Sequence, residues 1–195
     1  MAETNRITTP VFRLCYSKIA DPEIKESDGK QYWSCTAVFP KGTDLSALKA
    51  AAKHVVANSS LRDKKGIRSP FCDGNVKADE WGEVFRDATY IRFSTNRPPK
   101  TADKNRQPIP AAEFYSGCYA RALVHPYAYD NVSQGVLFTL DAIQFMKDGD
   151  ELGGLTEKAA MDAFAEAPIP PEFAGDDDVF DGGDTKAADT EPDIF

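Results

Sequence analysis

The chain has 195 residues, 42% of them hydrophobic and 28% charged, and a formal net charge of −8. No apolar run approaches the roughly 18 residues of a membrane span, and the first residues lack a secretory signal, so a membrane or secreted protein is not expected. Four widely spaced cysteines and two histidines predict core thiols in a reducing compartment, with no metal site and no cofactor.

The negative charge is concentrated in residues 172–195. This segment holds nine acidic residues and one basic residue, so it carries −8, and residues 1–171 balance to zero with 22 of each sign. Few apolar side chains and mutual repulsion predict a disordered tail. The tail ends in Asp193, Ile194 and Phe195. We expect this apolar tip to dock onto a partner protein and the acids to compete for a basic groove; a solvated tail without a partner is the alternative.

The first half of the chain predicts a hairpin and a helix. Residues 11–20 are rich in β-formers and precede the breaking pair Asp21-Pro22, and residues 30–40 form a second strand. A helix is predicted from a cap at Thr43 or Asp44 to about Ala57, because apolar residues recur there at three- and four-residue steps. This helix is expected to pack on the sheet.

Two irregular basic segments are predicted on either side of a strand within residues 82–95, whose clearest part is residues 88–95. Residues 58–81 contain Arg62, Lys64, Lys65 and Arg68, and the proline-rich residues 97–110 contain Arg97 and Lys100 among others. Residues 41–125 hold 15 basic and 9 acidic residues, a local charge of +6. Such loops either bind an anionic partner or are simply solvated.

The second half predicts two more strands, over residues 114–124 and 134–146, joined by a connection that carries Pro126, Tyr127 and Tyr129. Gly117 predicts a bulge or the close approach of another backbone. A short helix over residues 156–166 and a stiff spacer at 168–171 precede the tail. The expected domain division is therefore 1–155, 156–171 and 172–195.

Five or so strands with one helix between them predict a mainly β protein with an OB-fold-like, five-stranded or elaborated barrel. Aromatic and basic side chains share strand faces in the pairs Tyr90 with Arg92 and Tyr119 with Arg121. Rings stack on bases and cations neutralise phosphates, so these faces predict binding of single strands. The predicted DNA-binding residues are Arg62, Lys64, Lys65, Arg68, Tyr90, Arg92, Arg97, Lys100, Tyr115, Tyr119 and Arg121.

Three motifs carry a more specific signal. They are Phe-Tyr-Ser-Gly-Cys-Tyr at 114–119, Tyr-Ala-Tyr at 127–129 and Lys-Asp-Gly-Asp-Glu-Leu-Gly-Gly at 147–154. With the early hairpin and helix, they resemble a family of tailed-phage OB-fold proteins that bind single-stranded DNA (ssDNA), over roughly residues 10–155. Residues 193–195 resemble the acidic tail ending in phenylalanine of bacterial and phage ssDNA-binding proteins.

The resemblance implies a non-catalytic, sequence-tolerant ssDNA-binding protein that serves phage replication or recombination in the host cytoplasm. Its tail would recruit phage or host replication proteins. One departure from the family pattern is the position of the helix, which follows the second long strand here and the third strand in the usual OB-fold.

Two other classes of function stay open. A Mg²⁺-dependent nuclease would need a metal site, for which Asp73, Asp79, Glu80 and Glu83 are the available carboxylates, although they match no metal motif. A phage structural protein or DNA mimic would instead act through the acidic tail.

Overall fold

The computed structural model describes residues 5–26, 29–152 and 165. Apart from residue 165 these belong to the first of two units, Met1–Gly154. The predicted helix over 156–166, the proline spacer and the acidic tail lie outside the described residues, again apart from residue 165. No helix among the described residues is long and apolar enough to cross a membrane.

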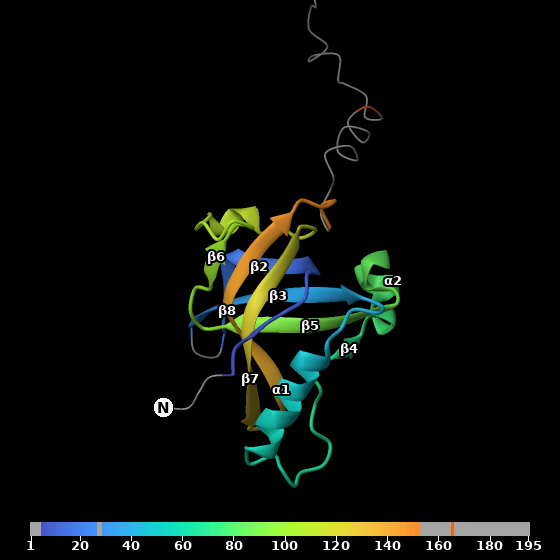
Figure 1. Cartoon of the computed structure of the whole chain (residues 1–195), viewed down its shortest axis with the longest axis vertical. Helices are drawn as coiled ribbons and strands as arrows, with labels where there is room; N and C mark the ends of the chain where they lie inside the picture. Colours follow the sequence, from blue (N-terminus) through green and yellow to red (C-terminus); the bar gives the residue numbers. More distant parts are fainter. Residues whose placement is uncertain (1–4, 27–28, 153–164, 166–195) are drawn as a thin grey trace, which may run out of the picture. The chain divides into compact units, whose positions relative to one another are not determined.

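The described part contains eight strands, two α-helices and three short 3-10 helices (Figure 1). In chain order they are β1 (Ile7–Thr8), β2 (Phe12–Ile24), β3 (Gln31–Pro40), α1 (Ser46–Ala57), β4 (Cys72–Asp73), η1 (Gly74–Val76), α2 (Ala78–Trp81), η2 (Glu83–Phe85), β5 (Ala88–Thr95), β6 (Lys100–Ala102), η3 (Ala111–Glu113), β7 (Tyr119–Asp130) and β8 (Gln134–Lys147).

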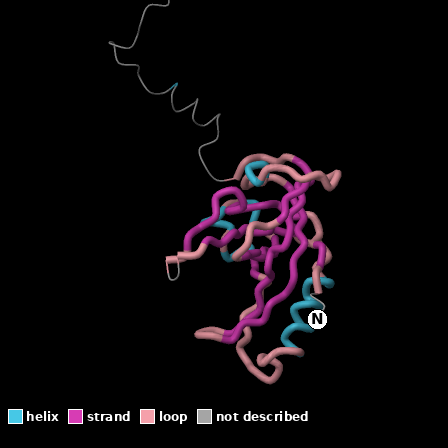
Figure 2. Tube along the Cα trace, turned by 90° about the vertical axis from the view of Figure 1, so that its left-hand side faces the viewer, coloured by secondary structure: helices cyan, strands magenta, loops and turns pink. Residues whose placement is uncertain are grey.

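The five long strands close into a barrel. Neighbouring strands follow the order β1-β7-β2-β3-β5-β8-β6, and β7 also pairs with β8, which joins β2, β3, β5, β8 and β7 in a ring. Four pairings of the ring are antiparallel and the β5–β8 pairing is parallel. A five-stranded closed barrel of this kind is the predicted OB-fold. The helix α1 follows the second barrel strand, as predicted, and lies outside the strands (Figure 2).

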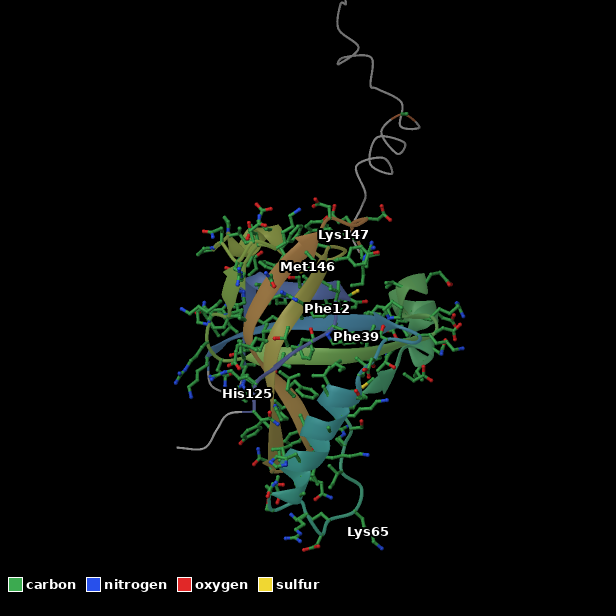
Figure 3. The ribbon with its side chains drawn as sticks, in the orientation of Figure 1. Phe12, Phe39, Lys65, His125, Met146 and Lys147 are labelled. Atoms are coloured by element: carbon green, nitrogen blue, oxygen red, sulfur yellow. The ribbon has the colours of Figure 1, made fainter. Side chains whose placement is uncertain are left out.

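Phenylalanine rings fill the barrel. Phe12 contacts Phe39 and Phe93 edge to face, with ring centroids 5.5 and 5.9 Å apart, and Phe93 contacts Phe138 at 6.2 Å (Phe12 and Phe39 are labelled in Figure 3). All four rings are fully buried. Edge-to-face pairs contribute about 0.5–1.5 kcal/mol each beyond the burial of area. This chain of rings therefore fixes β2, β3, β5 and β8 around one core.

A second, smaller cluster covers the outer face of β3 and β5. Val38 of β3 packs there with Ala78, Phe85 and Ala88. The segment that supplies Ala78 and Phe85 forms η1, α2 and η2, so residues 72–81 are not an irregular loop as predicted. The pair Asp73-Gly74 favoured an irregular segment, but burial of these apolar side chains against β3 stabilises the helical turns that follow it.

Two predicted element boundaries in the first half are wrong. The pair Asp21-Pro22 does not end β2, because Pro22 lies where the β2–β3 register shifts between Lys18 and Glu23 and no regular ladder bond is required of it. The helix begins at Ser46, with Leu45 as the N-cap residue. The Asp44 carboxylate instead accepts a hydrogen bond from the Ser46 N–H at 2.9 Å, and the Thr43 hydroxyl donates to the Pro40 carbonyl.

The strand predicted over residues 114–124 is displaced along the chain. It begins at Tyr119 and continues to Asp130, so Tyr127 and Tyr129 lie on β7 and not in a connection. Residues 114–118 form a turn instead, because Gly117 has φ +120° and cannot continue a strand there. Pro126 is accommodated within β7 opposite Phe138.

The turn at residues 114–118 meets the segment after β8. The Leu152 N–H donates to the Ser116 carbonyl at 2.7 Å, and the Tyr115 hydroxyl bonds with both Asp148 and Gly149. Gly117 lies against the backbone of Asp150 so closely that a Cβ atom would overlap its carbonyl group. Two of the three motifs that carry the family resemblance therefore form one structural junction, which confirms the close approach predicted for Gly117.

We predict that Gly117→Ala destabilises the barrel strongly, because the left-handed φ alone costs about 1–3 kcal/mol and the overlap with Asp150 adds to it. Thermal unfolding of the variant should show a clearly lowered midpoint. Gly42→Ala is the matched control, since Gly42 has φ +90° but nothing within 4 Å of its Cβ position. If Gly117→Ala and Gly42→Ala lowered the midpoint of thermal unfolding equally, the junction would not constrain the fold.

Candidate nucleic-acid interface

A groove crosses the outer face of β3, β5, β8 and β7, and we call it the tyrosine groove. Its volume is about 680 Å³. Three tyrosine rings, two cations and several hydroxyl-bearing side chains line it, with an apolar floor on β8. The lining residues are Lys25, Tyr32, Arg92, Ser94, Thr95, Asn96, Tyr127, Tyr129, Val136, Leu137 and Thr139.

Strand alternation brings these side chains together. On β5, Ile91 and Phe93 point into the barrel core, so Arg92 and Ser94 face outward. The register places Ser94 opposite Ser34 of β3 on one side and beside Thr139 of β8 on the other. The groove is therefore a continuous surface of four paired strands, and its shape depends on the closure of the ring.

The β7 tyrosines lie over the partner strand. Tyr129 is paired with Gly135 and Tyr127 with Leu137. A Cβ atom at Gly135 would collide with the Tyr129 ring, so the absence of a side chain at Gly135 lets that ring lie against β8. Tyr127 is 55% exposed and has a ring face available to a ligand.

One carboxylate organises the other end of the groove. Glu23 accepts a hydrogen bond from the Tyr32 hydroxyl, which raises the pKa of Tyr32, and its Oε2 lies 3.9 Å from Nη2 of Arg92. The Lys25 ammonium lies 5.4 Å from the centroid of the Tyr32 ring and donates to the Asn96 side chain at 3.1 Å. These contacts orient two cations and one ring while leaving a net positive charge.

The first basic segment lies beside this groove. Hydrogen bonds from Arg68 N–H to the Gln134 carbonyl and from Val136 N–H to the Arg68 carbonyl attach it to the start of β8. Lys64 pairs with Asp130 at 2.6 Å, and the hydrogen bonds from Lys64 and Ser60 lower the pKa of Asp130. The charge of Lys64 is thus already compensated.

The other three cations of this segment that were predicted to bind DNA lie in different places. Lys65 is exposed at the outer end of the loop (Figure 3). Arg62 and Arg68 line an apolar pocket between the segment and α1, with Lys49, Lys53 and Phe71. The segment therefore presents several positive charges next to the tyrosine groove without contributing to its lining.

The second basic segment is divided. Arg97 is exposed just after β5, while Lys100 of β6 and Arg121 of β7 line a separate small pocket. The predicted set of residues is therefore spread over the groove and its two flanks, and Arg92 is the member that lines the groove itself.

The three tyrosines that were predicted to bind DNA contact other parts of the protein. Tyr90 contacts Trp81 and Phe85, each at 5.6 Å between centroids, within the cluster on the outer face of β3 and β5. Tyr115 is not on a strand and its hydroxyl belongs to the junction with Asp148 and Gly149. The Tyr119 ring is covered by the cations of Arg13 at 4.8 Å and Lys147 at 4.5 Å.

The groove residues that the sequence reasoning missed are Lys25, Tyr32, Tyr127 and Tyr129. A signal for the β7 pair existed, because Leu123, His125, Tyr127 and Tyr129 continue the two-residue alternation of the predicted strand. Pro126 was interpreted as a strand breaker, so the strand was predicted to end before Tyr127. Tyr32 was placed on the correct strand, but only the fold shows which other strands lie beside it.

The carboxylates considered for a metal site have other partners. Asp73 accepts hydrogen bonds from Asn75, Glu80 pairs with Lys77 at 2.8 Å, and Glu83 pairs with Arg86 at 2.7 Å. Arg86 also reaches Asp79 at 3.4 Å. Within the described residues there is no group of three or more metal-ligating side chains suited to an ion.

Comparison with known proteins identifies the family. Residues 5–178 match the family of the ssDNA-binding protein of Enterobacter phage Enc34, so the chain belongs to this family. "Putative protein p50" of Acyrthosiphon pisum secondary endosymbiont phage 1 is 30% identical over 156 residues, which span 73% of this chain and 83% of that protein. The phage ssDNA-binding family predicted from the motifs is thereby confirmed.

Two solved structures share the fold. The ssDNA-binding protein from bacteriophage Enc34, in complex with ssDNA, aligns with a TM-score of 0.65 at 20% identity, over 77% of this chain and 91% of that one. The T7 protein gp2.5, a single-stranded DNA binding protein, aligns with a TM-score of 0.56 at 12% identity, over 85% of this chain and 97% of that one. These likenesses confirm the OB-like architecture.

We predict that the two kinds of tyrosine respond differently to truncation. Tyr90→Ala should lower the free energy of unfolding by about 2–3 kcal/mol, because it leaves a gap beside Trp81 and Phe85. Tyr127→Ala removes an exposed ring and should change it by less than about 0.5 kcal/mol. Urea denaturation measures both, and a Tyr127→Ala loss as large as that of Tyr90→Ala would place Tyr127 among the packing residues.

Proposed function

We propose that the chain is a non-catalytic, sequence-tolerant ssDNA-binding protein and that DNA lies in the tyrosine groove. The observation that carries the proposal is the grouping of three tyrosines with Lys25 and Arg92 on one face of the barrel. This face includes the second and third barrel strands and adjoins the loops β2–β3 and β7–β8, the region with which OB-folds bind oligonucleotides. Membership of a family named for ssDNA binding supports it.

In the proposed binding mode, different side chains stack on the bases and neutralise the phosphates. Tyr127, Tyr129 and Tyr32 offer ring faces on which bases stack, each worth about 1–3 kcal/mol. Lys25 and Arg92 neutralise phosphates. The hydroxyls of Ser94, Thr95 and Thr139 donate hydrogen bonds to the sugar-phosphate backbone of the DNA. Every base has a π face, so stacking of this kind does not select a sequence.

The flanking cations extend the electrostatic surface. We assign Lys65, Arg68 and Arg97 to phosphate contacts outside the groove, with Arg62 beside them. Lys64 has a smaller role because Asp130 already neutralises it. Tyr90, Tyr115 and Tyr119 are assigned to packing and to the orientation of neighbouring cations.

A cleavage assay distinguishes a binding protein from a Mg²⁺-dependent nuclease. Labelled ssDNA incubated with the chain and Mg²⁺ should stay intact, because the carboxylates at residues 73–83 are engaged by Lys77, Arg86 and backbone groups. Cleavage products that disappear on chelation of the metal would overturn the non-catalytic assignment.

The biological role we propose is protection and organisation of single strands during phage replication or recombination in the host cytoplasm. The segment 172–195 carries −8 and residues 41–125 carry +6. We infer that the acidic segment competes with DNA for the basic surface, and that Asp193, Ile194 and Phe195 bind replication proteins of the phage or host. A protein that acts through its acidic segment alone, as a DNA mimic, would not bind ssDNA.

We predict that Tyr127→Ala weakens binding of oligothymidylate by about tenfold to a hundredfold, the loss expected for one stacking ring. Fluorescence anisotropy of a labelled oligonucleotide measures the dissociation constant. Tyr127→Phe keeps the ring and should bind as the unmodified chain does. Normal binding by Tyr127→Ala would remove the groove from the proposed DNA path.

We also predict that deletion of residues 172–195 tightens ssDNA binding, most at low salt, because a tethered acidic segment has a high effective concentration and salt screens its charge. Phe195→Ala removes no charge and is the matched control. It should leave DNA affinity unchanged and reduce capture of replication proteins from infected cells. Equal affinity of the deleted and intact chains at low salt would contradict the competition.

A further inference from the structure

The small pocket lined by Lys100 and Arg121 lies between the short edge strands β1 and β6, over β7 and β8, and we call it the edge pocket. Its volume is about 260 Å³. Small and aliphatic side chains form the floor, and three cations, a hydroxyl and an amide stand around it. The lining residues are Thr8, Lys100, Ala102, Arg106, Arg121, Ala122, Leu123, Ala142, Ile143 and Gln144.

The cations of the edge pocket have no carboxylate partner in the part of the chain that the structure describes. Within the described residues, Lys100, Arg106 and Arg121 make no ion pair with a carboxylate. The carboxylates on the adjoining segments are engaged elsewhere. Asp141 contacts Arg6 at 3.0 Å and His125 at 2.8 Å, and Asp103 accepts hydrogen bonds from the backbone N–H groups of Asn105 and Gln107. Three like charges around a small apolar floor attract an anion.

Arg121 is oriented by a neutral group. Its Nε donates to Oε1 of Gln144 at 2.6 Å, and Nε2 of Gln144 donates to the Asp103 carbonyl at 2.7 Å. Both ends of the amide are used, so the guanidinium is held in place without loss of its charge. Its two terminal nitrogens donate to no group among the described residues, and a guanidinium fork matches the oxygens of a phosphate.

Arg106 is held by a tight turn. The Asp103 N–H donates to the Gln107 carbonyl at 2.8 Å, and the Arg106 N–H donates to the Asp103 carbonyl at 3.0 Å. Arg106 has φ +67°, a conformation that costs a residue with a side chain about 1–3 kcal/mol. The turn thus keeps Arg106 at the rim of the pocket in a backbone conformation that a flexible loop would avoid.

The edge pocket continues the line of the tyrosine groove along β8. Leu137 and Thr139 line the groove, and Ala142 and Gln144 line the edge pocket. The neighbour of β8 changes between these two places, from β5 at Phe138–Thr139 to β6 at 142–144. Thr139 and Ala142 are about 10 Å apart along a strand. A single strand that follows β8 out of the groove therefore passes over the edge pocket.

We propose that the edge pocket binds a backbone phosphate of the same ssDNA that occupies the tyrosine groove. The proposal rests on the proposed function and adds a second subsite with a different chemistry: stacking in the groove and anion binding at the edge. Its consequence is a dependence on length. A short oligonucleotide fills the groove alone, whereas a longer one reaches Lys100, Arg106 and Arg121.

The test compares oligothymidylates from about 4 to about 16 nucleotides, a range that covers OB-fold site sizes, on the full chain and on the double variant Lys100→Ala/Arg106→Ala. The variant should bind the shortest ligand normally and the longest about tenfold more weakly at low salt. For the long ligand, its slope of log K against log salt should be less steep by about 0.7 to 1.4, the value for one or two phosphates.

Two further variants make the result specific. Lys104→Ala removes a cation from the same turn but outside the pocket and should bind every length normally. Gln144→Glu places a carboxylate against Arg121 and should reproduce the loss for long ligands, and thermal midpoints show whether the variants keep their fold. Unchanged affinity of a folded double variant for the longest ligand would overturn the edge subsite. Length-independent loss in Tyr127→Ala would still support the groove, and an intact chain without ssDNA affinity would overturn both.

Discussion

The antiparallel pairing of β7 with β8 closes the barrel, and both proposed binding surfaces depend on it. The pairing runs from Tyr119 opposite Lys147 to Asp130 opposite Gln134. One half of this ribbon belongs to the ring that encloses the phenylalanine core, which fixes its twist and position. The same two strands carry Tyr127 and Tyr129 of the groove near the hairpin end and line the edge pocket further along.

Closure also explains why two of the three motifs are not at the groove. The turn around Gly117 and the segment around Asp150 contact each other where β7 starts and β8 ends. A close backbone approach and several hydrogen bonds restrict the residue types at this place severely. A DNA-binding surface that works by stacking and charge is less restrictive, because any ring or cation at the right position serves.

Polar contacts in the two sites orient cations without removing all of their charge. In the groove, Glu23 lies near Arg92 and accepts a hydrogen bond from Tyr32, so one carboxylate serves a cation and a ring. In the edge pocket, Gln144 holds Arg121 by a neutral amide. A carboxylate there would neutralise the guanidinium, whereas an amide fixes its direction at no electrostatic cost. This difference matches the two proposed roles, base stacking in the groove and phosphate binding in the edge pocket.

Local sequence patterns determined most of the elements. Alternation and turn residues predicted the hairpin of β2 and β3, the strand β5 with its bounds, and β8, because these signals depend on near neighbours in the chain. The family also followed from local motifs, and the charge of residues 172–195 from composition. What the sequence could not determine is which outward side chains become neighbours. Tyr32 and Tyr129 are almost a hundred residues apart, and only the closed ring brings them to one groove.

The tertiary structure also decided which aromatic side chains are exposed and which are covered by other segments. Tyr90 of β5 and Tyr127 of β7 both lie on long strands of the barrel. Folding of residues 74–85 over β3 and β5 covers Tyr90 with Trp81 and Phe85, while Tyr127 stays exposed. Exposure is set by which distant segments pack on a strand face, and alternation along one strand specifies the face without specifying what covers it.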